Sequence, residues 1–296
     1  MNRIRTAIYA DKTFKTGYSG KNIGIALLDS GIARHTDISE RITVFRDFVH
    51  RRKDPYDDNG HGTHVAGILS GNGAASEGKL CGIAPQANLI VLKVLDAEGN
   101  GETKDVLKAL AWVDDHQKIY NIRLLNFSVG FLPSADYMEQ QKLIASLEEL
   151  WDKGVMVVTA AGNRGPKERT VTVPGISRKI LTVGASDDEL SASSHMKRGY
   201  SGSGPTSCCI VKPEILAPGT RVLSCSNLDN GYVYKSGTSM AAPVVCGALA
   251  LAFERFPSMT PAQMKLRLHE TVQPKGSEIH RNCWGILNVD NLMGLN

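Results

Sequence analysis

The sequence lacks any apolar run long enough to cross a membrane. Its longest candidate, residues 240–253, is shorter than the roughly 18 residues that a spanning helix needs, and it carries Pro243. The N-terminal stretch 1–20 contains two arginines but no apolar segment of the kind that a secretory signal peptide has. We therefore predict no membrane partner and a cytoplasmic protein, secreted only if the chain is a processed mature form.

Cysteine is scarce and charge is balanced. The six cysteines form no CxxC pair, and in a chain of 296 residues they do not resemble a disulfide scaffold, so reduced thiols are expected. The 34 basic and 30 acidic residues are interspersed and leave a net charge of +4, which is too small an excess to predict a nucleic-acid partner. A hydrophobic content of 42% is enough for a sizeable core and excludes a globally disordered chain.

Several signature motifs are also missing. The sequence contains neither a P-loop nor a GxGxxG motif, which argues against a nucleotide-binding protein. No GxSxG elbow occurs, so an esterase or lipase of the α/β-hydrolase type is remote. His61 and His64 stand close together, but no HExxH motif accompanies them, and a zinc site is not favoured.

Short apolar runs rich in Val, Ile and Leu alternate with segments of helical periodicity. Continuous apolar strands are typical of a parallel sheet that is covered on both faces. The expected strands are residues 23–30, 88–96, 122–130, 155–163 and 180–187, and the expected helices include residues 103–119 and 137–154. This alternation predicts an α/β fold with a doubly wound, mainly parallel central sheet flanked by helices on both faces.

We see no linker, repeat or second domain along the chain. Residues 1–296 are therefore expected to form a single domain, since α/β folds often reach this length as one unit. Within it, residues 1–20 are an N-terminal extension that could serve as a short pro-segment. The oligomeric state is not predictable from these patterns.

Three polar residues stand at the ends of expected strands. Asp29 ends the first, Ser128 lies at the end of the third and Asn163 at the end of the fourth. In doubly wound sheets, sites form beyond the carboxyl ends of the strands. We therefore expect these three side chains to share one site.

Three motifs place an aspartate, a histidine and a serine in settings that suit nucleophilic catalysis. They are Asp29-Ser30-Gly31, NGHGTHVAG at 59–67 and SGTSMAAPV at 236–244. A serine hydroxyl needs a base to take its proton, and that base needs a third group to hold its tautomer. With VMVVTAAGN at 155–163 and NFSVG at 126–130, these blocks resemble the subtilisin family of serine proteases, and the chain is most like the intracellular bacterial subtilisin-like proteases.

The resemblance implies a serine endopeptidase of broad specificity that works through an acyl-enzyme. It implies a triad of Asp29, His61 and Ser239, and an oxyanion hole formed by the side chain of Asn163 and the backbone N–H of Ser239. It gives His64 and Asn126 structural roles. It also implies that polypeptide substrates bind along Ser128, Val129, Gly130, Ala160, Ala161 and Gly162.

Two questions stay open at this stage. The first alternative is a pseudoprotease that binds peptides without turnover, because a sequence does not show whether the catalytic geometry is intact. The second concerns metal: the chemistry requires no cofactor, but the family resemblance makes a structural calcium conceivable. Asp37 could match one family ligand, whereas the Gly-rich stretch 70–80 is short of obvious ligands, so the sequence does not decide between a bound calcium and none.

Overall fold

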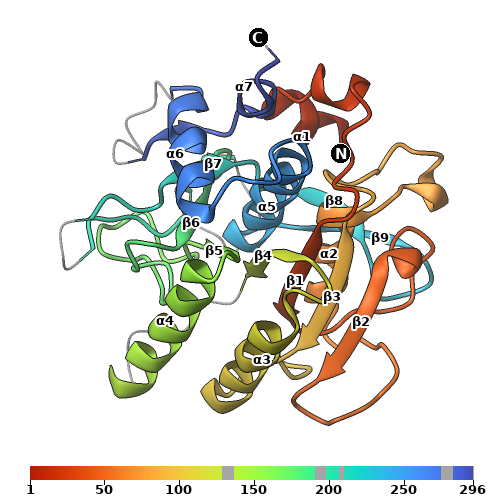
Figure 1. Ribbon diagram of the computed structural model, residues 1–296. Coiled ribbons are helices and arrows are strands. Elements are labelled where there is room, and N and C mark those ends of the chain that lie inside the picture. Colours follow the sequence, from red (N-terminus) through yellow and green to blue (C-terminus); the bar gives the residue numbers. More distant parts are fainter. Residues whose placement is uncertain (129–136, 191–197, 207–209, 275–282, 296) are drawn as a thin grey trace.

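The computed structural model describes residues 1–128, 137–190, 198–206, 210–274 and 283–295. A sheet of eight parallel strands forms its centre (Figure 1), in the order β10-β7-β6-β5-β4-β1-β3-β2. The strands, in chain order, are β1 (Gly24–Asp29), β2 (Ile42–Asp47), β3 (Asn88–Lys93), β4 (Ile122–Phe127), β5 (Met156–Ala160), β6 (Leu181–Ala185), β7 (Ile215–Ala217) and β10 (Gly285–Ile286).

The five strands expected from apolar runs are all present. In β1, β5 and β6 every residue is buried, which is the pattern of a strand covered on both faces. Three strands have no such run: β2 is a half-exposed edge strand, and β7 and β10 are only three and two residues long. Their pairing depends on neighbours that are distant in sequence.

Helices cover both faces of the sheet, as predicted (Figure 1). Helices α2 (His61–Ser70) and α5 (Thr238–Arg255) pack together on one face, and α3 (Thr103–His116) and α4 (Tyr137–Asp152) pack together on the other. The remaining helices are α1 (Asn2–Ala7), α6 (Pro261–Thr271) and α7 (Val289–Met293). An antiparallel hairpin of β8 (Val222–Cys225) and β9 (Tyr232–Lys235) precedes α5.

The strand order reverses around β1, which lies between β3 and β4. From β1 the chain crosses β3 to reach the edge strand β2, and from β2 it runs back through β3, past β1, to β4, β5 and β6, so the connections after β1 and after β4 lead to opposite sides. The loops that follow β1 and β4 diverge at this point, and this is where doubly wound folds leave room for a site.

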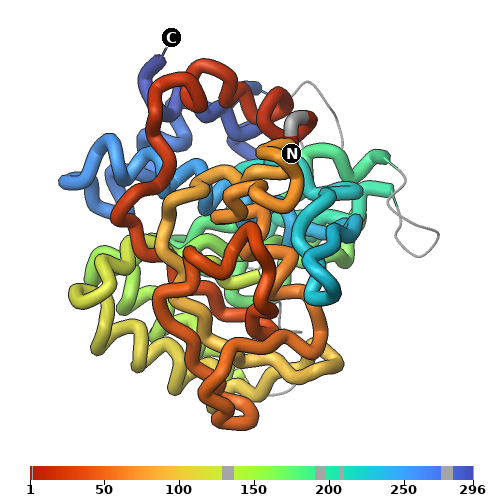
Figure 2. Tube along the Cα trace, turned by 90° about the vertical axis from the view of Figure 1, so that its right-hand side faces the viewer, coloured from red at the N-terminus to blue at the C-terminus, as the bar shows by residue number. Residues whose placement is uncertain are grey.

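The N-terminal segment packs against the C-terminal part of the chain (Figures 1 and 2). Ile4 and Ile8 are buried, and the backbone carbonyl of Ile8 accepts a hydrogen bond from the N–H of Val289 at 2.8 Å. Asp290 accepts hydrogen bonds from the backbone N–H and the hydroxyl of Thr13 at 2.8 and 2.6 Å. Residues 1–13 are thus integrated into the fold.

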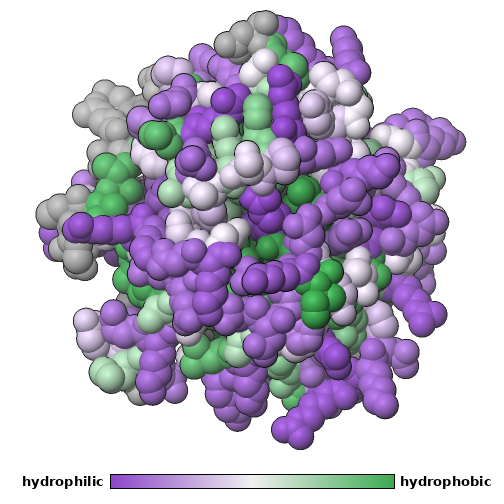
Figure 3. Space-filling model, in the orientation of Figure 1, coloured by the Kyte–Doolittle hydropathy of each residue, from purple (hydrophilic) through white to green (hydrophobic). Residues whose placement is uncertain are grey.

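Hydrophilic side chains predominate on the face shown in Figure 3, where hydrophobic ones are scattered. Among the described residues, no helix combines the length and the apolar character that a membrane crossing requires.

Candidate active site

Asp29 and His61 are brought into contact at the carboxyl end of β1. The Nδ1 atom of His61 lies 2.7 Å from Oδ1 of Asp29, which is a short hydrogen bond between an imidazole and a carboxylate. Asp29 is completely buried, whereas the His61 side chain is 24% exposed. The pair therefore has a buried member, Asp29, and a member that is open to solvent, His61.

The first turn of α2 holds His61 in this position. Backbone N–H groups at a helix start have no intrahelical partner. Here side chains supply the acceptors: Asn59 for the N–H of His61, Ser30 for that of Gly62 and Asp57 for that of Thr63, at 3.2, 2.9 and 2.8 Å. A Cβ atom at Gly62 would lie 2.1 Å from the carbonyl oxygen of Gly31, so only glycine allows α2 to approach β1 this closely.

The electrostatics of the two histidines differ. Burial disfavours the charged form of His61, but the charge of Asp29 and its hydrogen bond outweigh burial, so the pKa of His61 is raised above 6.5. Burial lowers the pKa of His64 to about 3, and its Nε2 atom contacts the carbonyl oxygens of Val222 and Val233. His64 is therefore a neutral, buried residue that joins α2 to the β8–β9 hairpin.

Ser239 lies in the first turn of α5, where its backbone N–H is among those without an intrahelical acceptor. Its hydroxyl donates to the carbonyl oxygen of Ser128 at 3.0 Å, and among the described residues no hydrogen bond joins it to His61. Gly237 precedes the helix at a φ of 147°, a conformation that side chains rarely adopt. The serine is in place, but its hydroxyl points to the backbone in this form.

Asn163 is exposed, and its amide has a defined orientation. Its Oδ1 atom accepts hydrogen bonds from the backbone N–H of Thr238 at 2.9 Å and from the hydroxyl of the same residue at 3.1 Å. Because the oxygen is engaged by Thr238, the NH₂ group of Asn163 remains to donate. The nearest side-chain atom to a Cβ built on Gly237 is Nδ2 of Asn163, at 3.1 Å, so this donor lies beside the start of α5.

Sequence reasoning missed Thr238. Its buried hydroxyl accepts from the N–H of Gly162 at 3.1 Å and donates to Asn163, so one side chain holds both the loop and the amide. The available signal was its position directly before Ser239 in the GTS sequence. A threonine before a helix start is more often read as a cap, and its partners, 75 and 76 residues away, come only from the fold.

The expected substrate-binding residues have different environments. Ser128 is nearly buried, and its hydroxyl accepts a 2.7 Å hydrogen bond from the amide of Asn126, which is itself fully buried. Ala160 and Ala161 are buried, while Gly162 is partly exposed. Val129 and Gly130 lie outside the described residues.

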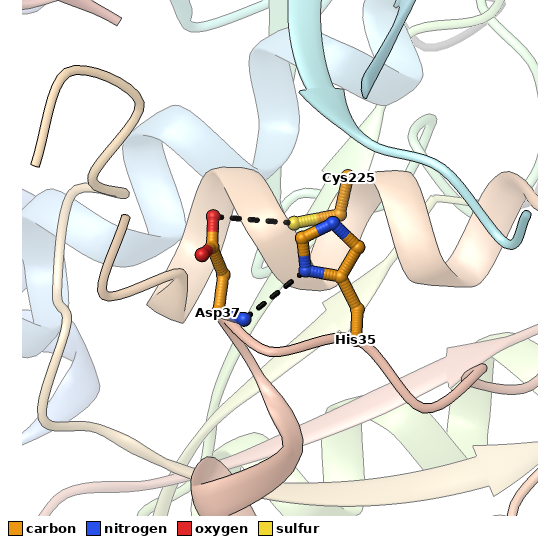
Figure 4. A group of neighbouring side chains, drawn as sticks. All are labelled: His35, Asp37 and Cys225. Atoms are coloured by element: carbon orange, nitrogen blue, oxygen red, sulfur yellow. Dashed lines mark hydrogen bonds between the residues drawn. The ribbon is translucent and has the colours of Figure 1, made fainter. Parts of the chain in front are cut away.

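A buried cluster of His35, Asp37 and Cys225 is the one group of potential metal ligands among the described residues (Figure 4). Both oxygens of Asp37 already accept hydrogen bonds, Oδ1 from the N–H of Ala75 at 2.8 Å and Oδ2 from the hydroxyl of Tyr232 at 2.7 Å. The Nδ1 atom of His35 accepts from the N–H of Asp37.

Calcium takes six to eight oxygen ligands, whereas this cluster offers one carboxylate beside a histidine nitrogen and a cysteine sulfur, so these three side chains do not make a calcium site. Asp37, the calcium ligand that the family resemblance suggested, takes part in a hydrogen-bonded cluster here. Cys81, Cys225 and Cys246 carry free thiols, and Cys208 and Cys209 lie outside the described residues.

The parallel α/β fold, with the Asp–His pair and the serine of a buried helix at its switch point, defines a subtilisin-like serine protease, a hydrolase that acts on polypeptides. The sequence profile of the subtilase family matches residues 20–292, and the chain belongs to this family. Among its relatives, the serine protease AprX of Bacillus subtilis is 37% identical, over 96% of this chain and 70% of AprX.

Subtilisin DY of Bacillus licheniformis is 30% identical, over 96% of this chain and 95% of that protein. The crystal structure of a cold-adapted subtilisin-like serine proteinase superposes with a TM-score of 0.75 at 27% identity, covering 92% of this chain and 90% of the other. Sphericase gives a TM-score of 0.74 at 29% identity, covering 86% and 84%. The fold expected from the sequence is thus confirmed.

Proposed function

We propose that this chain is a serine endopeptidase whose triad is Asp29, His61 and Ser239. The observation that carries the proposal is the 2.7 Å contact between buried Asp29 and Nδ1 of His61. This contact keeps the Nδ1–H tautomer, so Nε2 is free to act as a base. A histidine in a purely structural role, such as His64, is instead buried and bonded through Nε2.

In the first half-reaction, the hydroxyl of Ser239 turns from the carbonyl of Ser128 towards His61, which takes its proton as the oxygen attacks the substrate carbonyl. The hydrogen bond between a nucleophile and its general base is often long or poorly aligned before substrate binds. Asp29 stays ionised and stabilises the imidazolium. His61 then gives the proton to the leaving amine, and an acyl-enzyme on Ser239 remains.

In the second half-reaction, a water molecule takes the place of the leaving amine. His61 removes a proton from that water, the hydroxide oxygen attacks the acyl carbon, and Ser239 recovers its proton as the acid product leaves. Both tetrahedral intermediates carry an oxyanion. We assign its stabilisation to the NH₂ group of Asn163 and the backbone N–H of Ser239, helped by the positive end of α5.

We propose that the substrate binds at the carboxyl ends of the strands, where the proposed triad lies. An extended peptide that pairs with residues 128–130 gains affinity from backbone hydrogen bonds, which favours broad specificity. Ala160, Ala161 and Gly162 would line the pocket for the residue before the cut. We propose that residues 1–296 form one peptidase domain, with residues 1–20 as its N-terminal extension. The cytoplasmic location stays a prediction.

Hydrolysis of unfolded casein and of a chromogenic peptide tests the mechanism. The wild type should cleave both and should be labelled by a serine-directed fluorophosphonate, and Ser239→Ala should abolish cleavage and labelling. Circular dichroism of the variant checks that it is folded. A folded wild type that neither cleaves nor takes the label would refute the proposal and favour the peptide-binding pseudoprotease.

A further inference from the structure

Lys93 is a buried cation on the strand next to Asp29 of the proposed triad. It is the last residue of β3 and pairs in register with Asp29, the last residue of β1. Its side chain is 0% exposed. The chain that follows it bends around Asp29, because the N–H groups of Val94 and Leu95 both donate to the carbonyl oxygen of Asp29, at 2.9 and 3.3 Å.

The ammonium group of Lys93 uses all three of its donors. It donates to the carbonyl oxygens of Ser30 and Leu95 at 2.6 and 2.8 Å, and to Oδ1 of Asp58 at 2.6 Å. A buried ammonium without partners would be very costly, so this complete set fixes the positions of the partners as well as that of the lysine. Two of these partners, Ser30 and Asp58, lie on different segments of the proposed active site.

Those segments are the ones that carry Asp29 and His61. Ser30 follows Asp29 in the chain, and Asp58 lies in the loop three residues before His61. Lys93 therefore joins the residue that follows β1 to the loop that leads into α2. We propose that Lys93 is a positioning residue that holds the two segments at the spacing that the Asp29–His61 hydrogen bond requires.

This proposal rests on the proposed function, and it assigns Lys93 no contact with substrate. Its loss should therefore lower kcat and change KM little. For Lys93→Met we expect kcat to fall about 10- to 100-fold, the size of effect that a displacement of about 1 Å causes in a catalytic group. A purely structural lysine would change stability without this pattern.

Lys212 is a matched control. Its side chain is also 0% exposed, and its Nζ atom donates to a backbone carbonyl, that of Ile180, at 2.8 Å and to a carboxylate, Glu214, at 2.7 Å. It contacts no residue of the proposed triad. Folded Lys212→Met should therefore lose stability but keep wild-type kcat and KM.

Asp58 allows a second test if Lys93→Met fails to fold. The Asp58 side chain is 32% exposed, so its substitution is less disruptive than that of the lysine. Asp58→Asn keeps an oxygen that can accept from Lys93, whereas Asp58→Ala removes it. We expect Asp58→Ala to lower kcat about tenfold and Asp58→Asn to lower it less. Equal values of kcat for the two variants and the wild type would count against the positioning role of Lys93.

A spectroscopic test separates this proposal from the proposed function. The measurement requires no catalytic activity, so it can be made in the Ser239→Ala variant. There, the hydrogen-bonded Nδ1 proton of His61 should give a downfield proton NMR resonance. Adding Lys93→Met should move it upfield or broaden it by exchange, and adding Lys212→Met should not. An unchanged resonance and kcat in a folded Lys93→Met protein would overturn the proposal. Inactivity of the wild type would overturn only the proposed function.

Discussion

Replacing Thr238 by valine tests how the proposed oxyanion donor is held. The two side chains have nearly the same shape, so the substitution removes the hydroxyl without opening a cavity. Two hydrogen bonds of 3.1 Å are lost, one from the N–H of Gly162 and one to Oδ1 of Asn163. The 2.9 Å bond from the backbone N–H of residue 238 to Asn163 does not depend on the side chain and should persist.

The size of the effect follows from these contacts. A buried N–H that loses its acceptor costs about 1–3 kcal/mol, and because Gly162 is partly exposed we expect about 1 kcal/mol of stability to be lost. Removing such an oxyanion donor altogether costs about 100- to 1,000-fold in kcat, a magnitude measured in a subtilisin itself. Since Asn163 keeps one of its two bonds to residue 238, we expect about a tenfold drop, or about 1.4 kcal/mol.

Steady-state hydrolysis of a chromogenic peptide measures kcat and KM for Thr238→Val. Thr238→Ser keeps the hydroxyl and should stay near the wild type, while Asn163→Leu removes the donor and sets the upper limit of the loss. Urea unfolding of each variant gives the stability term separately. The reasoning would be refuted if Thr238→Val kept the wild-type kcat, or if the whole effect fell on KM.

Three further outcomes are expected. The rate kcat/KM should fall in acid with a midpoint above pH 6.5, because His61 must be neutral to accept a proton and its pKa is raised by Asp29; a midpoint well below 6.5 would contradict this in a pH–rate profile. Peroxide should inactivate the wild type, because Met240 follows Ser239 and its sulfoxide would place a polar group beside the site; inactivation should be slow, because Met240 is only 2% exposed. Met240→Ala should be protected, and equal loss of activity in both proteins would exclude Met240 as the site of inactivation. Asp57→Ala should lower the free energy of unfolding by about 3 kcal/mol at pH 7, because Asp57 accepts several buried hydrogen bonds. Burial alone would raise the pKa of Asp57, but those bonds hold it below its ordinary 3.8, so its contribution is present above that pH and lost as the pH falls through the folded-state value. The difference in the free energy of unfolding between wild type and variant should therefore narrow in strong acid, as urea unfolding at several pH values would show.

The strands of the central sheet were predictable because their cause is local. A strand covered on both faces must be apolar along its length, and residues 23–30 and 155–163 carry that pattern in the sequence itself. Their ends were less exact: β5 stops at Ala160, because Ala161 and Gly162 turn to bond with residues 172 and 202. The edge strand β2 carries no apolar run, since one side of it meets solvent.

The residues of the proposed triad were also recognisable from the chain, because each lies in a family motif that spans only a few residues. What the motifs did not contain is the set of contacts that connect them. The sheet register places Lys93 beside Asp29, and the start of α5 places Thr238 against Asn163. The sequence did not show that Asp37 accepts hydrogen bonds from Ala75 and Tyr232, because these partners lie far from it along the chain.

The sequence by itself thus determined the α/β class and the order of the main elements, and it supplied the side chains proposed to react, because periodicity and short motifs are local properties of the chain. The tertiary structure alone decided that the hydroxyl of Ser239 bonds to Ser128 in this form, and which buried groups support Asp29, His61 and Asn163. Those contacts join residues about 30 to 110 positions apart. Because buried polar groups find their hydrogen-bond partners only when distant segments pack together, these contacts leave no local pattern in the sequence.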